Sequence, residues 1–180
     1  MVAKTLQAKR YSQALFEIAK ERNEFDNWQE NLRKIAAFAQ NSEFVEVMEN
    51  PQFPIEEKFK LLDVRLKNIS PLALNLAYIL ADKGSFDLIT YISVDYKKLL
   101  DSYRGIEQAE VTTAVPLSEK EQKEMAVRLG AITGKKVVMT LRVDPEIIGG
   151  VIAKVGDKII DGSTRSQLED LKNELSGAGG

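Results

Sequence analysis

The chain has 180 residues, of which 44% are hydrophobic and 29% charged, and its 25 basic side chains nearly balance its 27 acidic ones. This length allows one domain or two small ones, and the lack of a basic excess argues against a nucleic-acid-binding protein. The sequence contains neither Cys nor His, which excludes thiol and imidazole chemistry and ordinary zinc sites. Carboxylates and lysines form no converging motif, so we expect no catalytic residue, metal or cofactor.

Residues 3–104 have the hydrophobic periodicity of successive helices. A first helix is predicted over residues 4–21. A second places one apolar stripe at spacings of three and four, made of Phe25, Trp28, Leu32, Ile35 and Ala39. Asn41 or Ser42 can cap a short third helix, which ends before Pro51.

Three more helices complete the N-terminal part. The fourth follows a proline, and the fifth begins at Ser70-Pro71, where a capping serine precedes proline at the first helical position. Gly84 ends the fifth helix, and Ser85 can cap a sixth. Six short helices with short connections predict an all-α bundle over residues 1–105.

After Gly105 the hydrophobic period changes from 3.6 to two, which indicates strands. One strand is predicted over residues 109–115, and a second over residues 137–143. Between them, Ser118 and Glu121 have the spacing of a capping box, which predicts the start of a helix.

The remaining segment predicts a hairpin followed by a helix. Residues 151–155 and 158–161 form the hairpin arms, and Gly156-Asp157 suits a two-residue turn of type II′. The final helix carries leucines on one side, namely Leu168, Leu171 and Leu175. The C-terminal part, residues 106–180, is thus a small βαβββα domain, and the whole chain is predicted to be α+β, mainly α.

Four glycines in this segment, Gly149, Gly150, Gly156 and Gly162, raise the alternative of a phosphate-binding loop. Their spacing matches neither a Walker motif nor a GxGxxG turn between a strand and a helix. We therefore interpret Gly149 and Gly150 as sites of a bulge or a close backbone approach, and Gly156 and Gly162 as turn positions with positive φ. The neighbouring acidic residues lack the ligand spacing of an EF-hand.

The first and fifth predicted helices have more apolar surface than a small bundle needs. In the first, Tyr11, Ala14, Leu15 and Ile18 belong to an apolar arc of roughly 200°, about twice the usual stripe. The fifth, PLALNLAYILADKG from residue 71, is apolar nearly all round. Either the fifth helix is central and surrounded by the other five, or the two helices leave a groove that a partner helix fills.

Three stretches resemble the delta subunit family of bacterial F-type ATP synthases, the counterpart of the mitochondrial oligomycin-sensitivity-conferring protein. RYSQALFEIA at residues 10–19 is similar to the family's opening helix, and ILADKGSFDLI at residues 79–89 is similar to the end of its fifth helix. The longest, IIGGVIAKVGDKIIDGSTRSQLEDL at residues 147–171, is similar to its C-terminal signature. The resemblance implies that this glycine-rich stretch is a hairpin and helix, not a nucleotide site.

The resemblance also implies a non-catalytic stator subunit of the proton-translocating enzyme. The bundle would bind the N-terminal helix of an alpha subunit through residues of helices one and five, namely Tyr11, Ala14, Leu15, Ile18, Leu76, Ile79 and Leu80. The C-terminal domain would hold the end of the b-subunit stalk, and we expect that contact at Leu168, Leu171 and Leu175. The same leucines could instead cover the small sheet.

No apolar run approaches the roughly 18 residues of a membrane-spanning helix, and the N-terminus lacks the apolar core of a signal peptide. We expect no direct membrane insertion, and the resemblance implies a peripheral position on the cytoplasmic face of the cell membrane. Two other functions stay open. A helical RNA-binding regulator would need a basic face, whereas the basic residues here are interleaved with acidic ones. A small enzyme would have to use the glycine-rich segment.

Overall fold

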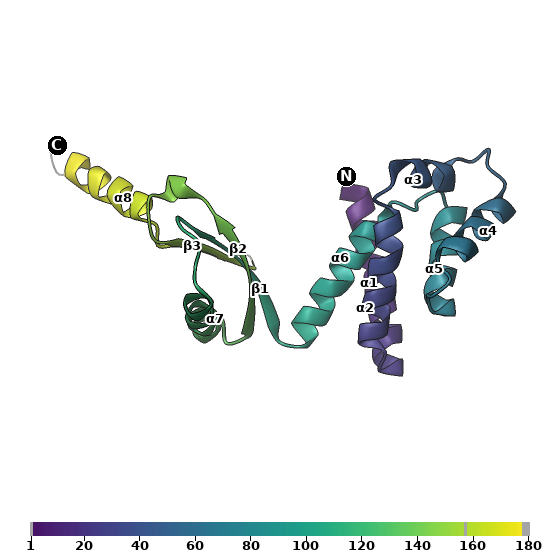
Figure 1. The fold of residues 1–180 in the computed structure, drawn as a ribbon, viewed down its shortest axis with the longest axis horizontal. Helices are drawn as coiled ribbons and strands as arrows, with labels where there is room; N and C mark the ends of the chain where they lie inside the picture. Colours follow the sequence, from purple (N-terminus) through teal and green to yellow (C-terminus); the bar gives the residue numbers. More distant parts are fainter. Residues whose placement is uncertain (1, 157, 178–180) are drawn as a thin grey trace. The chain divides into compact units, whose positions relative to one another are not determined.

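The computed structural model describes residues 2–156 and 158–177 (Figure 1). Contacts along the chain divide it into two compact units, Met1–Leu100 and Asp101–Gly180. The division falls within the last helix of the bundle, a little before the boundary predicted at residue 105. Helices predominate, and the described strands form one four-stranded sheet, so the predicted α+β, mainly α class is confirmed.

The bundle contains the predicted helices at these positions: α1 (Val2–Arg22), α2 (Phe25–Phe38), α3 (Ser42–Glu49), α4 (Ile55–Arg65), α5 (Pro71–Asp82) and α6 (Leu88–Tyr103). Asn41 caps α3 and Ser70 caps α5, each side chain accepting a backbone N–H three residues later, at 3.1 and 3.4 Å. The prediction that Ser85 caps α6 is wrong. Its hydroxyl donates to the Lys83 carbonyl, and α6 begins only at Leu88.

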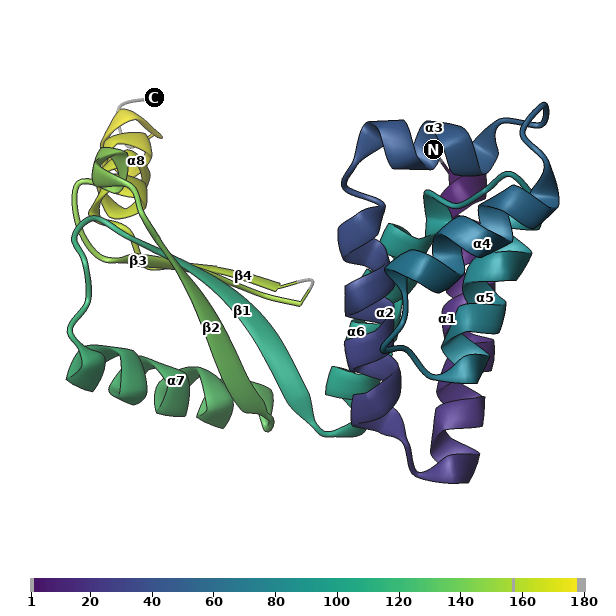
Figure 2. The same ribbon diagram turned by 45° about the vertical axis from the view of Figure 1, so that its right-hand side comes forward.

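Every bundle helix contributes side chains to one apolar core. Figure 2 shows α3 lying across one end of the bundle and α4 packed beside α5. Leu32, Ile35 and Tyr96 are fully buried, and the Tyr96 hydroxyl donates to the Phe25 carbonyl at 3.2 Å. Each large apolar side chain that leaves water in this way contributes roughly 1.5–3 kcal/mol, which is why the stripes of the sequence pattern face inward.

The second unit contains β1 (Ile106–Thr113), α7 (Glu119–Thr133), β2 (Lys136–Val143), the 3-10 turn η1 (Pro145–Ile147), β3 (Val151–Val155), β4 (Lys158–Asp161) and α8 (Thr164–Gly177). The strand order is β2-β1-β3-β4. β1 and β2 are parallel, and the other neighbours are antiparallel. The helix α7 connects the parallel pair, because parallel neighbours need a crossover.

The ends of β1 differ from the prediction. β1 begins directly after Gly105 and ends at Thr113, because it pairs with β2 residue by residue along its whole length. The Thr113 hydroxyl donates to the Val115 carbonyl at 2.8 Å, and Val115 is 65% exposed outside the sheet. Alternation of side chains identified the strand, but the partner strand sets its limits.

The helix α7 begins at its predicted capping box. The Ser118 hydroxyl accepts the Glu121 N–H, while the Glu121 carboxylate accepts hydrogen bonds from the Ser118 hydroxyl and N–H, which lowers the pKa of Glu121. Gly134 ends the helix with φ of +69°. One face of α7 reaches the sheet through Leu129, which is buried against apolar residues of β1, β2 and β3.

The loop between η1 and β3 packs tightly against the start of α8. Gly150 has φ of +77°, and a Cβ there would lie 2.2 Å from the carbonyl oxygen of Gly162. A Cβ at Gly149 would lie 2.8 Å from the Thr164 hydroxyl. Glycine is therefore required at both positions, because a side chain would collide with the segment just before or at the start of α8.

The two remaining glycines of the segment differ from each other. Gly156 has φ of +57° in the β3–β4 turn. Its partner in the turn, Asp157, lies outside the described residues, and so does the predicted turn type. The prediction of positive φ at Gly162 is wrong, because its backbone is outside the left-handed region. Gly162 instead donates its N–H to the Val151 carbonyl at 2.8 Å.

Ile148 is held in a strained turn just before these glycines. Its φ and ψ are +67° and −46°, and the Gly149 N–H donates to the Ile147 carbonyl at 2.8 Å, which makes a γ-turn. We expect Ile148→Gly to raise the free energy of unfolding of the second unit by about 1 kcal/mol. Relief of strain outweighs the greater entropy of glycine in the unfolded chain, and the exposed side chain contributes little packing.

Denaturant unfolding followed by circular dichroism measures this effect. Val138→Gly is the matched control, because Val138 is also a partly exposed β-branched residue of this unit but lies within β2. The control should lose stability, since glycine weakens a strand. If Ile148→Gly loses stability as the control does, the turn is not strained.

Candidate partner-binding surfaces

The first candidate surface lies where α1 passes the C-terminal end of α5. Two contacts link α1 with the end of α5 and the start of α6. The Lys4 ammonium is 2.6 Å from the Asp87 carboxylate, and the Lys83 ammonium donates to the Tyr11 hydroxyl at 3.3 Å. Both contacts involve the loop between α5 and α6, and Figure 2 shows α1 and α5 running in opposite directions.

The structure separates the residues for which the family resemblance implied an alpha-subunit contact. Leu15, Leu76 and Leu80 are buried in the bundle core, with at most 6% of each residue exposed. The others reach the surface: Tyr11 is half-buried, and Ala14, Ile18 and Ile79 are exposed. We call these four residues the α1/α5 surface.

The helix α5 is neither wholly buried nor wholly free. It contacts α2, α3 and α4, and its buried residues are Ala73, Leu76, Ala77, Leu80 and Ala81. Ile79 remains 46% exposed. Most of the surplus apolar surface of α5 is thus explained by packing inside the bundle, and Ile79 is the part that faces solvent.

A cavity of about 450 Å³ adjoins the α1/α5 surface and is lined by Gln7, Arg10, Tyr11, Ala14, Lys83, Ser85 and Leu88. The Lys83 ammonium lies 5.9 Å from the centre of the Tyr11 ring, on the hydroxyl side, so its contact with Tyr11 is the hydrogen bond. Sequence reasoning missed Arg10 and Lys83. The sequence carries no signal for them, because they lie far apart along the chain and only the fold brings them to one cavity.

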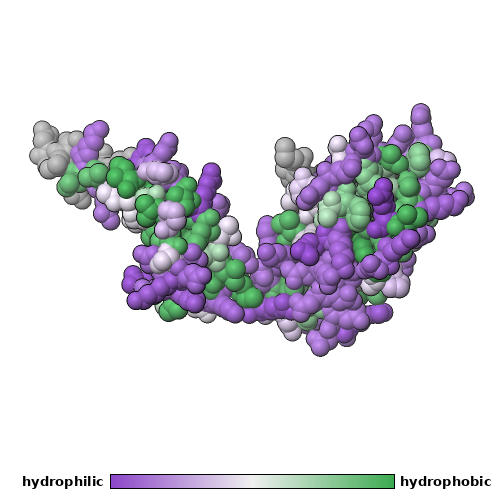
Figure 3. Space-filling model, viewed as in Figure 1, coloured by the Kyte–Doolittle hydropathy of each residue, from purple (hydrophilic) through white to green (hydrophobic). Residues whose placement is uncertain are grey.

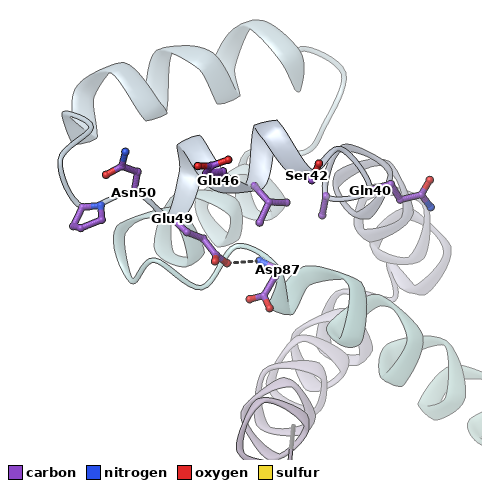
Figure 4. A pocket seen from close by; sticks show the side chains of 9 residues that line it. Gln40, Ser42, Glu46, Glu49, Asn50 and Asp87 are labelled. Carbon is purple, nitrogen blue, oxygen red and sulfur yellow. Dashed lines mark hydrogen bonds between the residues drawn. The ribbon is translucent and has the colours of Figure 1, made fainter.

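A second, larger cavity of about 640 Å³ lies beside α3, and its polar lining includes Glu46, Glu49 and Asp87 (Figure 4). The Asp87 N–H donates to the Glu49 carboxylate at 3.0 Å. Burial raises the pKa of Glu49. Asp87 also pairs with Lys4 and raises the pKa of that ammonium through a hydrogen bond. These contacts join α1, α3 and the start of α6, and they serve the bundle itself.

The second candidate surface is the leucine face of α8. Leu168 and Leu171 are 53% and 51% exposed, so the sheet does not cover them. The side chain of Leu175 lies outside the described residues. Figure 3 shows hydrophobic side chains at the surface near α8, among mostly hydrophilic neighbours. The described leucines are available to a partner.

The glycine-rich segment uses its backbone N–H groups internally. Gly162 donates to Val151 at 2.8 Å and Thr164 to Gly149 at 3.0 Å, whereas a phosphate loop points such groups outward. Within residues 2–156 and 158–177, no group of three or more Asp, Glu, His and Cys side chains is arranged to hold a metal ion. No helix of that part of the chain is long and apolar enough to cross a bilayer.

The fold defines a mainly helical α+β protein with exposed apolar side chains on α1, α5 and α8. Comparison with known families gives the particular one. The family model described as ATP synthase delta (OSCP) subunit matches residues 8–175, and the chain belongs to this family. It is therefore a peripheral-stalk component of the ATP synthase, as the resemblance in its sequence implied.

Relatives cover nearly the whole chain. The ATP synthase subunit delta of Dehalococcoides mccartyi is 40% identical over 94% of this chain and 93% of its own length. That of Desulfotalea psychrophila is 33% identical over 96% and 97%. A chain in the Toxoplasma gondii mitochondrial ATP synthase hexamer has a similar fold, with a TM-score of 0.66 at 22% identity, covering 93% of this chain and 96% of that one. The first two relatives are delta subunits, which are structural subunits of the ATP synthase.

Proposed function

We propose that this chain links the catalytic alpha/beta hexamer to the b-subunit stalk, so that the stator resists the torque of the rotor. In this proposal the bundle binds the N-terminal helix of an alpha subunit on the α1/α5 surface. The second unit binds the end of the stalk through the leucine face of α8. The complex would place the chain on the cytoplasmic face of the cell membrane, with no catalytic residues of its own.

The main observation that supports the proposal is the exposure of Ile79. Ile79 is surrounded in sequence by buried residues of α5, yet its own branched side chain is 46% exposed, and on α1 Ile18 is exposed too. A helix with apolar residues at every third or fourth position fits such a surface. The buried Leu15, Leu76 and Leu80 support it from beneath, which explains how residues of both kinds share one sequence pattern.

The stator role requires only that the chain dissociate slowly from its partners. A helix docked in an interface of standard size buries about 800 Å² on each partner and reaches nanomolar affinity when a few anchors are well desolvated. A second contact on the same molecule raises the effective concentration for rebinding. No observation on the described residues favours RNA binding or catalysis, so we propose no second function.

Ile79→Asp is expected to weaken binding of the alpha-subunit N-terminal helix by about 2–4 kcal/mol, because it puts a charge into an apolar contact. Calorimetric titration of the full chain with a peptide of that helix measures the loss. Val94→Asp is the matched control, since Val94 is also a half-exposed apolar residue of the bundle but lies on α6. Equal affinity in the wild type and both variants would contradict the α1/α5 assignment.

The double substitution Leu168→Asp and Leu171→Asp is expected to weaken stalk binding by about 2 kcal/mol or more. Pull-down by the soluble part of the b subunits, quantified against wild type, gives the result. Val127→Asp is the control, because Val127 is 72% exposed on α7 in the same unit. Stalk binding that survives the double substitution would place the contact elsewhere.

A further inference from the structure

The cavity beside Tyr11 carries two positive charges that the described chain does not neutralise. Arg10 and Lys83 both line it, and both are exposed. Neither takes part in the ion pairs found among the described side chains. Lys4, on the same helix as Arg10, is by contrast paired with Asp87 at 2.6 Å.

The Lys83 ammonium is already held at the cavity. It donates to the Tyr11 hydroxyl at 3.3 Å and lies 5.9 Å from the centre of that ring. An ammonium has three donors, so Lys83 keeps others for a partner. A side chain that is positioned before binding loses less entropy when an anion arrives.

These cations stand at one end of the apolar part of the α1/α5 surface. Ala14 lies one helical turn beyond Arg10 on α1, and Ile79 lies one turn before Lys83 on α5. Because the two helices run in opposite directions, both apolar residues lie on the same side of the cation pair. A helix that places its apolar anchors on Ile79 and Ala14 brings its next turn over Arg10 and Lys83.

We propose that the helix docked on the α1/α5 surface carries an Asp or Glu one turn beyond its apolar anchors, and that Arg10 and Lys83 bind this carboxylate. The inference rests on the proposed function, because it concerns the same surface. A short apolar strip accepts a helix in either direction and in several registers. A carboxylate that meets both cations in one arrangement selects that direction and register.

The test is calorimetric titration of the full chain with a peptide of the alpha-subunit N-terminal helix, at low and at high salt. Lys83→Met and Arg10→Gln remove the charges, and Lys83→Glu reverses one. Each neutral variant should lose about fivefold in affinity, and the reversal about tenfold or more. Lys9→Glu is the control for charge reversal, because Lys9 adjoins Arg10 in sequence but does not line the cavity.

A peptide series then identifies the carboxylate. Replacing the acidic residue by Lys at one peptide position should restore binding to Lys83→Glu, and only at that position. Such rescue, with an affinity that falls as salt rises, supports the inference. Wild-type binding that is unaffected by salt and by all three variants overturns it and leaves the proposed function standing. A wild-type chain that does not bind the peptide at all overturns both.

Discussion

Gly150→Ala is expected to unfold the Asp101–Gly180 unit while the bundle stays folded. The new Cβ would lie 2.2 Å from the Gly162 carbonyl oxygen and 3.1 Å from the Ser163 Cα, and both are backbone atoms that cannot rotate away. The residue would also keep φ of +77°, which disfavours any side chain. We expect the free energy of unfolding of this unit to fall by more than about 3 kcal/mol, which is a large part of the stability of a small unit.

Two probes separate the units in this experiment. Trp28 is the single tryptophan and is buried in the bundle, so its fluorescence reports on that unit, whereas circular dichroism reports on both. Gly105→Ala is the control, because Gly105 has φ of +65° but a Cβ there would meet nothing within 4 Å. Only the conformational penalty, about 1 kcal/mol, applies to it. If both variants lose the same free energy of unfolding, the contact with Gly162 does not determine the stability of this unit.

Leu80→Asp is expected to unfold the bundle, although the adjacent Ile79→Asp leaves it folded. Leu80 is 0% exposed and belongs to the core, while Ile79 is 46% exposed. A carboxylate at position 80 must either be buried unpaired or take up a proton, and both cost several kcal/mol on top of the lost apolar packing. At position 79 the carboxylate stays in water.

Thermal unfolding monitored by Trp28 fluorescence distinguishes the two variants. We expect a folded baseline and a cooperative transition for Ile79→Asp, and no native signal for Leu80→Asp. Loss of the native signal in Ile79→Asp would show that the Ile79 side chain is part of the core. Weaker binding of the alpha-subunit helix by that variant would then result from unfolding and would not test the binding surface. The pair of variants therefore tests the division of α5 between support and contact.

Local signals in the sequence predicted most of the elements. The Asn41 and Ser70 caps and the capping box at Ser118 act between residues three positions apart, so they need no information from elsewhere in the chain. Predictions failed at the ends of two elements, for a local reason in α6 and for a distant partner in β1. Ser85 does not cap α6, since its hydroxyl donates to the end of α5, and β1 takes its limits from β2.

By itself, the sequence determined the order of helices and strands, the two-part organisation of its hydrophobic periods and the family to which the chain belongs. The tertiary structure alone decided which apolar residues of α1 and α5 support the bundle and which face solvent. Periodicity gives the direction of a side chain around its own helix, but not whether a neighbouring helix lies there. For the same reason only the fold brings Arg10, Tyr11 and Lys83 around one cavity.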